Sequence, residues 1–257
     1  MIDRDGVVRP DDTFAHEAMI KHDPSIKIDD SYDYHTKNPF KIVYRGVLIF
    51  LVTIFLNIYY YIGLRLHVID RKNLKGLKNK KVIIAINHTH PLDVPIVVFN
   101  LFPFSRCYFV TIRENLQIPG VRHFVKLGGA IPKPVDLSST MRFNREVTEL
   151  LEHKKRLVFA REGSLWSYYR GYRPPKRGVY AYASKTNAVV VPIVFTYKKK
   201  KRIFSKKKKF YPICTICKPV YPNEKLNKKD SEVDLELRSE RQIKEVIKKA
   251  YDNLDKE

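Results

Sequence analysis

The stretch that organises the chain is Val82-Ile83-Ile84-Ala85-Ile86-Asn87-His88-Thr89-His90-Pro91-Leu92-Asp93-Val94-Pro95. Its first five residues are apolar and mostly β-branched without alternation, which predicts a strand that is buried on both faces of a sheet. Pro91 and Pro95 suit only the first turn of a helix, so a helix is expected to begin between them. A buried strand, a turn and a helix in this order indicate an α/β protein.

His88 falls at the end of the expected strand, and Asp93 falls in the first turn of the expected helix. A carboxylate on the far nitrogen of an imidazole holds one tautomer and stabilises the imidazolium, which a general base acting on a hydroxyl needs. Taken alone, the pair is equally consistent with a polar turn in which Asp93 only begins the helix.

Three later stretches strengthen the catalytic interpretation because they follow in a recognisable order. They are Gly128-Gly129-Ala130-Ile131-Pro132-Lys133, Phe159-Ala160-Arg161-Glu162-Gly163-Ser164 and Val190-Val191-Pro192-Ile193. Together with Asn87-His88 and Asp93, they resemble the signature blocks of the membrane glycerolipid acyltransferases, the 1-acylglycerol-3-phosphate acyltransferase-like (PlsC-type) family. Asn73-Leu74-Lys75-Gly76 and Cys217-Lys218-Pro219-Val220 resemble the segments before and after these blocks. The resemblance covers residues 65 to 225.

The resemblance implies a set of site residues. His88 is expected to be the general base and Asp93 its orienting partner. The residues expected to bind substrate are Asn87, Lys133, Arg161, Glu162, Gly163 and Ser164. Lys133 stands where the family has an Arg that contacts the phosphate of the acyl acceptor, so the charge is kept without the bidentate fork.

The third block departs from the family pattern. The family usually has Pro before the Glu and Thr-Arg-Ser after the Gly, whereas this chain has Arg161, Ser164 and Leu165 at the changed positions. A cation that would face the phosphate is therefore missing or is supplied by Arg161, Arg170 or Arg173. The aromatic and basic residues around Arg170 favour a rim at the level of lipid headgroups over a surface that stacks nucleobases.

The composition of the 257-residue chain narrows the class of protein. Cys107, Cys214 and Cys217 are too few for a disulfide framework, so a reducing compartment is expected. The Cys214 and Cys217 spacing lacks a second pair of ligands, and no metal or cofactor is expected beyond the acyl donor substrate. The net charge of +22 favours polyanionic partners, either an anionic membrane surface or nucleic acid.

Residues 46 to 64 form an uncharged, strongly apolar segment between Arg45 and Arg65. Its length is sufficient to cross a hydrocarbon core, with tyrosines where an interfacial belt would lie, although a buried helix or a helix in one leaflet has the same composition. The basic chain that follows favours a catalytic domain facing the cytoplasm. Membrane attachment weakens the nucleic-acid interpretation, so no nucleic-acid partner is expected.

These patterns predict an α/β fold with a mixed, mostly parallel sheet covered by helices on both faces, and with an N-terminal hydrophobic membrane helix or helical hairpin. We expect an acidic extension over residues 1–36, a membrane-anchoring segment over 37–66 and an acyltransferase domain over 67–257. Ser138 or Ser139 is expected to cap a helix, Pro175 to begin another, and Pro192 to mark a strand edge or bulge.

The expected function is transfer of a fatty acyl group from acyl-coenzyme A or acyl carrier protein to the hydroxyl of a lysophosphatidic-acid-like glycerolipid. Two alternatives remain open. The first is the same chemistry on another acceptor, such as a different lysophospholipid, an aminolipid or a glycolipid, and the altered third block motivates it. The second is a non-catalytic protein that binds membranes or nucleic acid through its basic surface.

Overall fold

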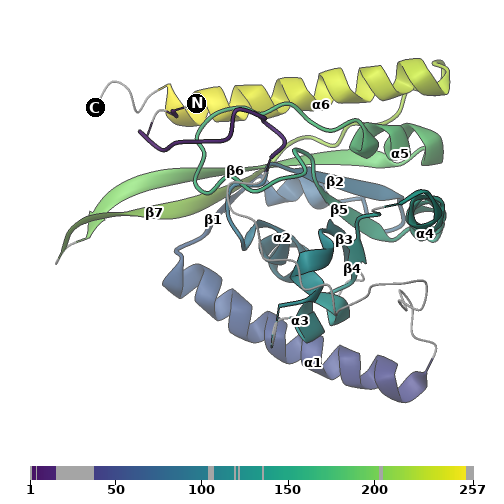
Figure 1. The fold of residues 1–257 in the computed structure, drawn as a ribbon, viewed down its shortest axis with the longest axis horizontal. Coiled ribbons are helices and arrows are strands. Elements are labelled where there is room, and N and C mark those ends of the chain that lie inside the picture. Colours follow the sequence, from purple (N-terminus) through teal and green to yellow (C-terminus); the bar gives the residue numbers. More distant parts are fainter. Residues whose placement is uncertain are drawn as a thin grey trace.

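The centre of the protein is a seven-stranded sheet with the order β1-β7-β6-β2-β5-β3-β4 (Figure 1). The computed structural model describes residues 2–3, 5–15, 38–103, 107–118, 120, 122–134, 136–202 and 205–252. All neighbouring strands are parallel except β6 and β7, which form an antiparallel hairpin. The strands are β1 (His67–Ile69), β2 (Val82–Ile86), β3 (Cys107–Thr111), β4 (Ala130–Pro132), β5 (Arg156–Ala160), β6 (Val189–Arg202) and β7 (Ser205–Ile216).

Helices cover both faces of this sheet. One face carries α2 (Asp93–Ile96), the π-helix that continues it (Val97–Leu101) and, further out, α1 (Pro39–Ile58) and α3 (Arg122–Leu127). The other face carries α4 (Leu137–Glu152), α5 (Gly178–Thr186) and α6 (Lys228–Tyr251), with α5 and α6 forming the upper layer in Figure 1. The mixed, mostly parallel sheet that the sequence predicts is confirmed.

The side chains of β2 explain why its sequence is apolar without alternation. Ile84 and Ile86 pack on one face of the sheet, in the same cluster as Ile96 and Leu101. Ile83 and Ala85 point to the opposite face, where the core contains the apolar sides of α4 and α5. Because both faces of a central parallel strand are covered, every residue of β2 is buried.

Three local predictions are corrected by the structure. Asp136, not Ser138 or Ser139, is the N-cap of α4, and the Ser139 hydroxyl closes the capping box by bonding back to the Asp136 backbone. The helix expected from Pro175 begins only at Gly178. Pro192 lies inside the central strand β6, not at a bulge or at the sheet edge.

The position of Pro192 explains why a proline is tolerated there. Its carbonyl oxygen accepts a hydrogen bond from the Cys217 backbone N–H at 2.9 Å, so its backbone polar groups face β7. The last residue of β7 is Ile216, which pairs with Ile193. The nitrogen of Pro192 therefore faces Cys217, just past the end of β7, so the proline forfeits one bond at the end of that ladder and none to the central strand β2.

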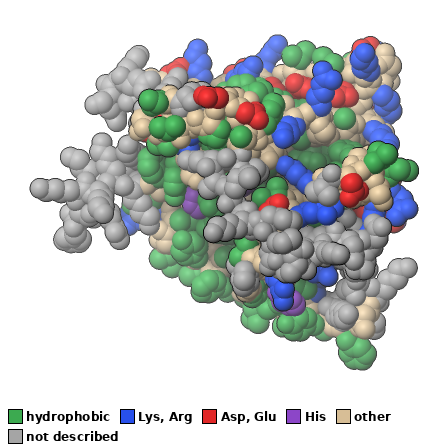
Figure 2. All heavy atoms as spheres, in the orientation of Figure 1, with side chains coloured by type: hydrophobic (Ala, Val, Ile, Leu, Met, Phe, Trp, Pro, Cys, Tyr) green, Lys and Arg blue, Asp and Glu red, His purple; other side chains and the backbone are tan. Residues whose placement is uncertain are grey.

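Helix α1 lies along the flank of the domain and leaves most of its surface uncovered (Figure 1). The side chains of Thr53 and Asn57 face the domain, and the Asn57 amide donates to the Phe99 carbonyl at 3.0 Å. Large apolar residues cover the outer side of α1 and of the π-helix that continues it (Tyr59–Gly63): Val43, Tyr44, Val47, Phe50, Leu51, Ile54, Phe55, Ile58, Tyr59, Tyr61 and Ile62. Hydrophobic side chains gather along this lower edge of the molecule (Figure 2). The segment Val43–Gly63 is long and apolar enough to cross a membrane, and 11% of it is buried.

The hairpin of β6 and β7 projects beyond the rest of the sheet (Figure 1). Its sequence contains a run of lysines between residues 198 and 209, but the side chains of residues 199–209 lie outside the described residues. Residues 16–36 of the expected acidic extension lie outside them too. The predicted boundaries at residues 36 and 66 stay predictions.

Candidate active site

Three of the resemblance blocks meet at one edge of the sheet because each follows a parallel strand. His88 comes directly after β2, the segment from Arg161 to Ser164 after β5, and Lys133 after β4. These strands run in the same direction, so their carboxyl ends lie at the same edge. The chain thus places side chains from distant sequence blocks around one point.

His88 and Asp93 form the pair that the spacing predicts. The Nδ1 atom of His88 lies 3.6 Å from Oδ2 of Asp93, and the imidazole is 18% exposed while the carboxylate is fully buried. The same Oδ2 accepts hydrogen bonds of 2.7 Å from the backbone N–H groups of Thr89 and His90. These two bonds fix the carboxylate beneath the imidazole, and a small movement would convert the contact into a hydrogen bond.

The neighbouring His90 has a different role from His88. Its Nδ1 accepts a hydrogen bond from the Leu92 backbone N–H at 3.0 Å, so the ring stabilises the turn that carries Asp93. Burial lowers the pKa of His90, against the opposing attraction of Asp93. Because its Nδ1 accepts the Leu92 N–H, His90 is a structural residue of this turn, whereas the Nδ1 of His88 faces Asp93.

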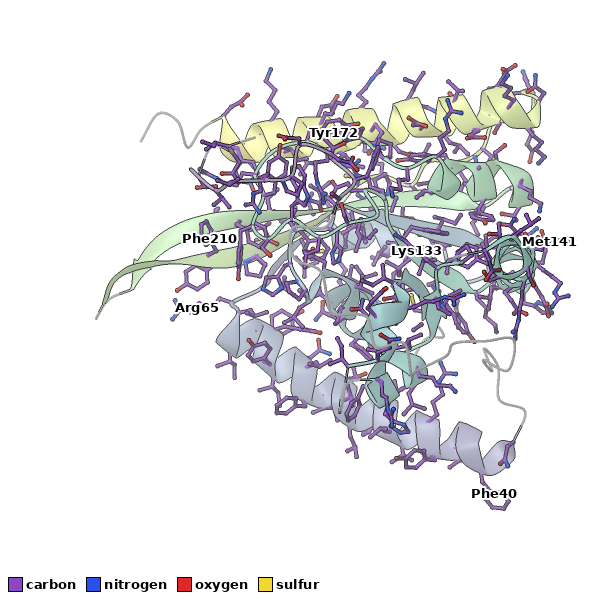
Figure 3. The ribbon with its side chains drawn as sticks, in the orientation of Figure 1. Phe40, Arg65, Lys133, Met141, Tyr172 and Phe210 are labelled. Atoms are coloured by element: carbon purple, nitrogen blue, oxygen red, sulfur yellow. The ribbon has the colours of Figure 1, made fainter. Side chains whose placement is uncertain are left out.

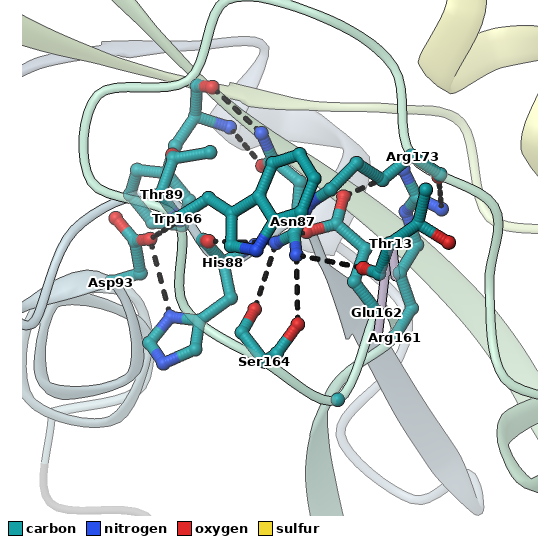
Figure 4. Close-up of polar contacts among 12 residues, drawn as sticks. Thr13, Asn87, His88, Thr89, Asp93, Arg161, Glu162, Ser164, Trp166 and Arg173 are labelled. Carbon is teal, nitrogen blue, oxygen red and sulfur yellow. Dashed lines mark hydrogen bonds and ion pairs between the residues drawn. The ribbon is translucent and has the colours of Figure 1, made fainter. Parts of the chain in front are cut away.

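Glu162 and Arg173 hold the backbone of His88 from the other side (Figure 4). One carboxylate oxygen of Glu162 accepts a hydrogen bond from the His88 backbone N–H at 3.1 Å and also contacts the Arg173 guanidinium. Arg173 in turn donates to the His88 carbonyl at 3.1 Å. Both side chains are almost completely buried, so this buried ion pair fixes the backbone position of His88.

Asn87 extends the sheet beyond the end of β2. Its amide group donates to the Phe195 carbonyl at 2.9 Å and accepts from the Phe195 N–H at 2.7 Å. The Asn87 side chain thus makes the two hydrogen bonds that a further strand residue would make, and it holds the turn against β6. The geometry therefore gives Asn87 a positioning role, one residue before His88.

Ser164 and Arg161 are buried in the same loop. The Ser164 hydroxyl accepts a hydrogen bond from Arg173 at 2.8 Å, and the side chain is fully buried. Arg161 donates to Glu162 at 3.0 Å and forms an ion pair of 3.1 Å with Glu240 on α6. Since Arg161 has no exposed surface and faces α6, it stabilises the fold and is not available to a substrate.

Lys133 and Gly163 meet at the outer side of this loop. The Lys133 amino group donates to the Gly163 carbonyl at 2.9 Å. Burial, reinforced by the nearby charge of Lys176 and opposed by that of Glu114, lowers the pKa of Lys133 to about 8. Gly163 has a φ of 73°, and a Cβ there would lie 2.9 Å from the Lys176 Cδ atom, so only glycine fits without strain.

The loop after Ser164 is less exposed than the predicted headgroup rim. Trp166 has no exposed surface and Arg173 is 1% exposed, whereas Tyr168 is 36% exposed. The backbone N–H groups of Trp166 and Tyr168 donate to the carbonyls of His88 and Thr89 at 3.2 and 2.7 Å. The rim interpretation was therefore wrong for Trp166 and Arg173, which support the His88 turn from within.

The first residues of the chain complete this loop, and the sequence gave no indication of that contact. Asp5 binds the Arg170 guanidinium through two hydrogen bonds of 2.7 and 2.8 Å. The indole N–H of Trp166 donates to the Ala15 carbonyl at 2.8 Å, and Arg173 donates to the Thr13 carbonyl at 3.3 Å. Neither the spacing nor the hydrophobic pattern of residues 2–15 carries a signal for such a pairing.

The described residues contain no group of three or more His, Cys, Asp or Glu side chains that could hold a metal ion. Cys107, Cys214 and Cys217 are free and buried, and burial raises the pKa of each thiol. Around His88 the structure places an imidazole beside a buried carboxylate, with the Lys133 amino group bound to the neighbouring Gly163 loop.

Two comparisons with known proteins found matches to this chain. A family model described as Acyltransferase matches residues 65–196. No curated protein sequence matches the chain. Among solved structures, the chain resembles the 1-acyl-sn-glycerophosphate (LPA) acyltransferase PlsC from Thermotoga maritima, with 18% sequence identity and a TM-score of 0.55. The match covers 82% of this chain and 84% of that one, and at this identity it shows a shared fold.

Proposed function

Because the chain belongs to the acyltransferase family, we propose that it transfers a fatty acyl group from acyl-coenzyme A or acyl carrier protein to a hydroxyl of a lysophosphatidic-acid-like glycerolipid. The observation that carries the proposal is the pair of His88 and Asp93 at the carboxyl edge of the sheet, 3.6 Å apart, with Lys133 nearby. A base and a cation are the two groups that a phosphorylated alcohol would need.

In the proposed reaction, His88 removes the proton from the acceptor hydroxyl through Nε2. The hydroxyl oxygen attacks the thioester carbonyl, and the tetrahedral intermediate collapses with cleavage of the carbon–sulfur bond. The imidazolium returns the proton to the leaving thiolate, so the products are an ester and a free thiol. Asp93 stabilises the imidazolium, and the transfer is direct, without an acyl-enzyme.

Glu162, Arg173 and Asn87 act in this proposal as positioning residues. Each binds the backbone on one side of His88 or of the residue before it. A shift of about 1 Å in a base can reduce the rate by about a hundredfold, so a rigid backbone is as necessary as the imidazole. Gly163 and Lys133 lie on the acceptor side of the same loop.

The exposed face of α1 supports attachment to a membrane, and we propose that α1 lies within one leaflet. The helix contacts the domain along its length, since Asn57 bonds to Phe99 and the Tyr44 ring lies 6.3 Å from that of His123. A membrane-crossing orientation would carry Arg122 and Lys126 of α3 into the hydrocarbon, which is costly for charged groups. The catalytic domain would then lie on the cytoplasmic side, and the basic surface would meet anionic lipid.

The decisive experiment measures release of free thiol from palmitoyl-coenzyme A or palmitoyl-acyl carrier protein by the purified, detergent-solubilised protein. Monoacylglycerol 3-phosphate, other lysophospholipids, an aminolipid and a glycolipid are supplied in turn as acceptors. We expect thiol release that is fastest with a phosphorylated acceptor and slower with the acceptors that lack the phosphate. The His88→Ala variant should lose it by at least about a hundredfold.

His153→Ala is the matched control, since His153 is exposed at the end of α4, near the amino ends of β2 and β5 and so at the opposite edge of the sheet from His88. Its activity should equal that of the unaltered protein. Turnover that is faster with an acceptor lacking phosphate than with any phosphorylated acceptor would redirect the proposal to a different substrate. A folded protein that binds vesicles and shows no turnover with any acceptor would contradict it.

A different acceptor is the second candidate, and Leu165 favours it. The family resemblance has an Arg at this position, and Leu165 cannot bind a phosphate. The acceptor panel distinguishes the two candidates directly.

A further inference from the structure

The arginines of the loop after β5 already have carboxylate partners. Arg161 pairs with Glu162 and Glu240, and Arg170 pairs with Asp5. Arg173 also pairs with Glu162. Each guanidinium is thereby neutralised inside the protein. None of the three is left to replace the cation that is missing at Leu165.

Two lysines at the same loop differ from these arginines. Among the described residues, no carboxylate lies within ion-pair distance of the amino group of Lys133 or of Lys176. The Lys133 amino group donates to the Gly163 carbonyl, and the Lys176 amino group lies 5.0 Å from the centre of the Phe14 ring. Glu114 attracts Lys133 from a greater distance. In the part of the chain that the structure describes, these two positive charges thus have no carboxylate in direct contact.

Both lysines converge on one glycine. The Lys133 amino group contacts the carbonyl of Gly163, and the Lys176 side chain passes over the Cα atom, with its Nζ 3.3 Å from where a Cβ would stand. The charges are close enough that Lys176 contributes to the low pKa of Lys133. Lys133 lies at the level of the sheet, well below Tyr172 under α6 (Figure 3).

Gly163 also connects the lysines to the reacting centre. Its neighbour Glu162 binds the His88 backbone N–H at 3.1 Å. An anion bound beside Gly163 would therefore lie on the same loop that positions the base. In a phosphorylated glycerol, the phosphate and a free hydroxyl are only a few bonds apart. An acceptor whose phosphate lies beside Gly163 would therefore have its hydroxyl on the side of His88.

We propose that Lys176 and Lys133 together form the site for the phosphate of the acceptor, with Lys176 supplying the charge that Leu165 lacks. The inference rests on the proposed function and names the specificity-determining residue of its acceptor side. The ligand is a phosphomonoester on a glycerol backbone. Lys133 approaches it from the strand edge and Lys176 from the loop, where the Phe14 ring holds the ammonium by a cation–π contact.

The test compares Lys176→Met with the unaltered protein. Methionine keeps an unbranched stem over Gly163 and removes only the charge. Kinetic constants are measured with monoacylglycerol 3-phosphate and with monoacylglycerol, which lacks the phosphate. We expect KM for the phosphorylated acceptor to rise roughly ten- to a hundredfold, as for the loss of a charged hydrogen bond. KM for monoacylglycerol and kcat for both should stay within about twofold.

Two further variants make the result specific. Lys176→Arg keeps the charge and should restore most of the affinity for the phosphorylated acceptor. Lys229→Met removes an exposed lysine at the start of α6, and its kinetic constants should equal those of the unaltered protein. An equal rise in KM for both acceptors in Lys176→Met would indicate a structural effect and overturn the assignment.

A binding measurement keeps this inference distinguishable from the proposed function. Calorimetric titration with short-chain monoacylglycerol 3-phosphate is done on His88→Ala, with and without Lys176→Met. Turnover by the unaltered protein with unchanged KM in Lys176→Met would overturn the lysine pair and leave the function standing. Absent turnover with weaker binding in the double variant would overturn the function and support the phosphate site. If His88→Ala and the double variant bind monoacylglycerol 3-phosphate with equal affinity, the phosphate site is overturned.

Discussion

At the scale of single residues, replacing Asp93 tests how the proposed base, His88, is held. In Asp93→Asn, the amide oxygen can still accept the backbone hydrogen bonds of Thr89 and His90, which are now 2.7 Å long. A neutral amide cannot stabilise an imidazolium, so we expect kcat to fall about 10²- to 10⁴-fold. Steady-state kinetics measures the loss, and thermal unfolding checks the fold. Turnover within about threefold of the unaltered protein would show that the carboxylate is structural.

Arg173 should matter more for stability than any other side chain of the loop. It binds Glu162, the Ser164 hydroxyl and the His88 carbonyl while being 1% exposed. Arg173→Met leaves the Glu162 charge buried with Arg161 as its remaining partner. Breaking such a buried pair lowers the free energy of unfolding by about 3–5 kcal/mol. Denaturant unfolding of Arg173→Met, with Arg170→Met as the less buried control, measures the difference, and equal values would contradict the argument.

The pKa of Lys133 gives the reaction a predictable pH dependence. Because that pKa is lowered to about 8, the ammonium is present below pH 8 and is lost above it. A phosphomonoester is already a dianion over this range. KM for a phosphorylated acceptor should therefore rise as the pH increases from about 7 to about 9, whereas KM for monoacylglycerol should not.

Two variants check which group causes this rise in KM with pH, which we call the pH step. In Lys133→Arg, the guanidinium stays charged, so the rise in KM above pH 8 should disappear. In Lys176→Met, a repelling charge is removed while burial and Glu114 remain, so the step should move to higher pH. A step at the same pH in all three proteins would assign it to another group.

At the scale of elements, the segment of residues 2–15 acts as a partner of the loop after β5. Trp166 is the only tryptophan of the chain, and its indole N–H donates to Ala15. Deleting residues 2–15 removes this bond and the Asp5–Arg170 pair. We expect a red shift of the tryptophan emission, faster hydrogen exchange in the loop, and a fall in kcat larger than any change in KM for the thioester.

Asp5→Asn is the smaller version of the same experiment. It removes one ion pair that is about 15% exposed and leaves the Trp166 bond in place. Its emission spectrum should equal that of the unaltered protein, with an intermediate effect on exchange around Arg170. If the deletion leaves emission and exchange unchanged, the segment does not support the loop.

The elements were predictable to the extent that their sequences carry local signals. The apolar run of β2 and the order of the blocks predict the sheet and bring His88, Glu162 and Lys133 to one edge. The cap of α4 was missed within a local sequence, because Asp136 and the predicted Ser139 compete for the same turn and the aspartate is the cap. The other features that could not be predicted depend on tertiary contacts, as for Pro192, which is tolerated centrally because β7 ends beside it. The burial of Arg161 depends on Glu240, which lies on α6 and far along the chain.

At the scale of the whole molecule, charge and apolar surface favour the same partner. The net charge of +22 attracts any polyanion, but the outer side of α1 adds a continuous apolar surface that nucleic acid does not cover. Binding to DNA would depend on salt alone. Binding to a bilayer has a hydrophobic component that salt leaves intact.

Vesicle binding of the full chain tests this combination. Phe50, Phe55 and Ile62 on the outer side of α1 are 48%, 71% and 76% exposed, and each would be buried in a leaflet. Replacing all three with Asn should weaken binding to anionic vesicles by about 4 kcal/mol or more, which is roughly a thousandfold. The same replacement of Val233 and Leu237, which are exposed on α6 at the opposite side of the sheet, should have little effect.

The salt dependence of the unaltered protein completes the argument. Raising the salt concentration weakens the attraction of its lysines to anionic lipid, because the Debye length shortens, but it does not weaken insertion of α1. We therefore expect substantial vesicle binding at about 0.5 M salt, where DNA binding through the same charges is lost. If instead the α1 variant binds vesicles as the unaltered protein does, and both dissociate at this salt concentration, attachment is electrostatic. The exposed face of α1 would then require another partner.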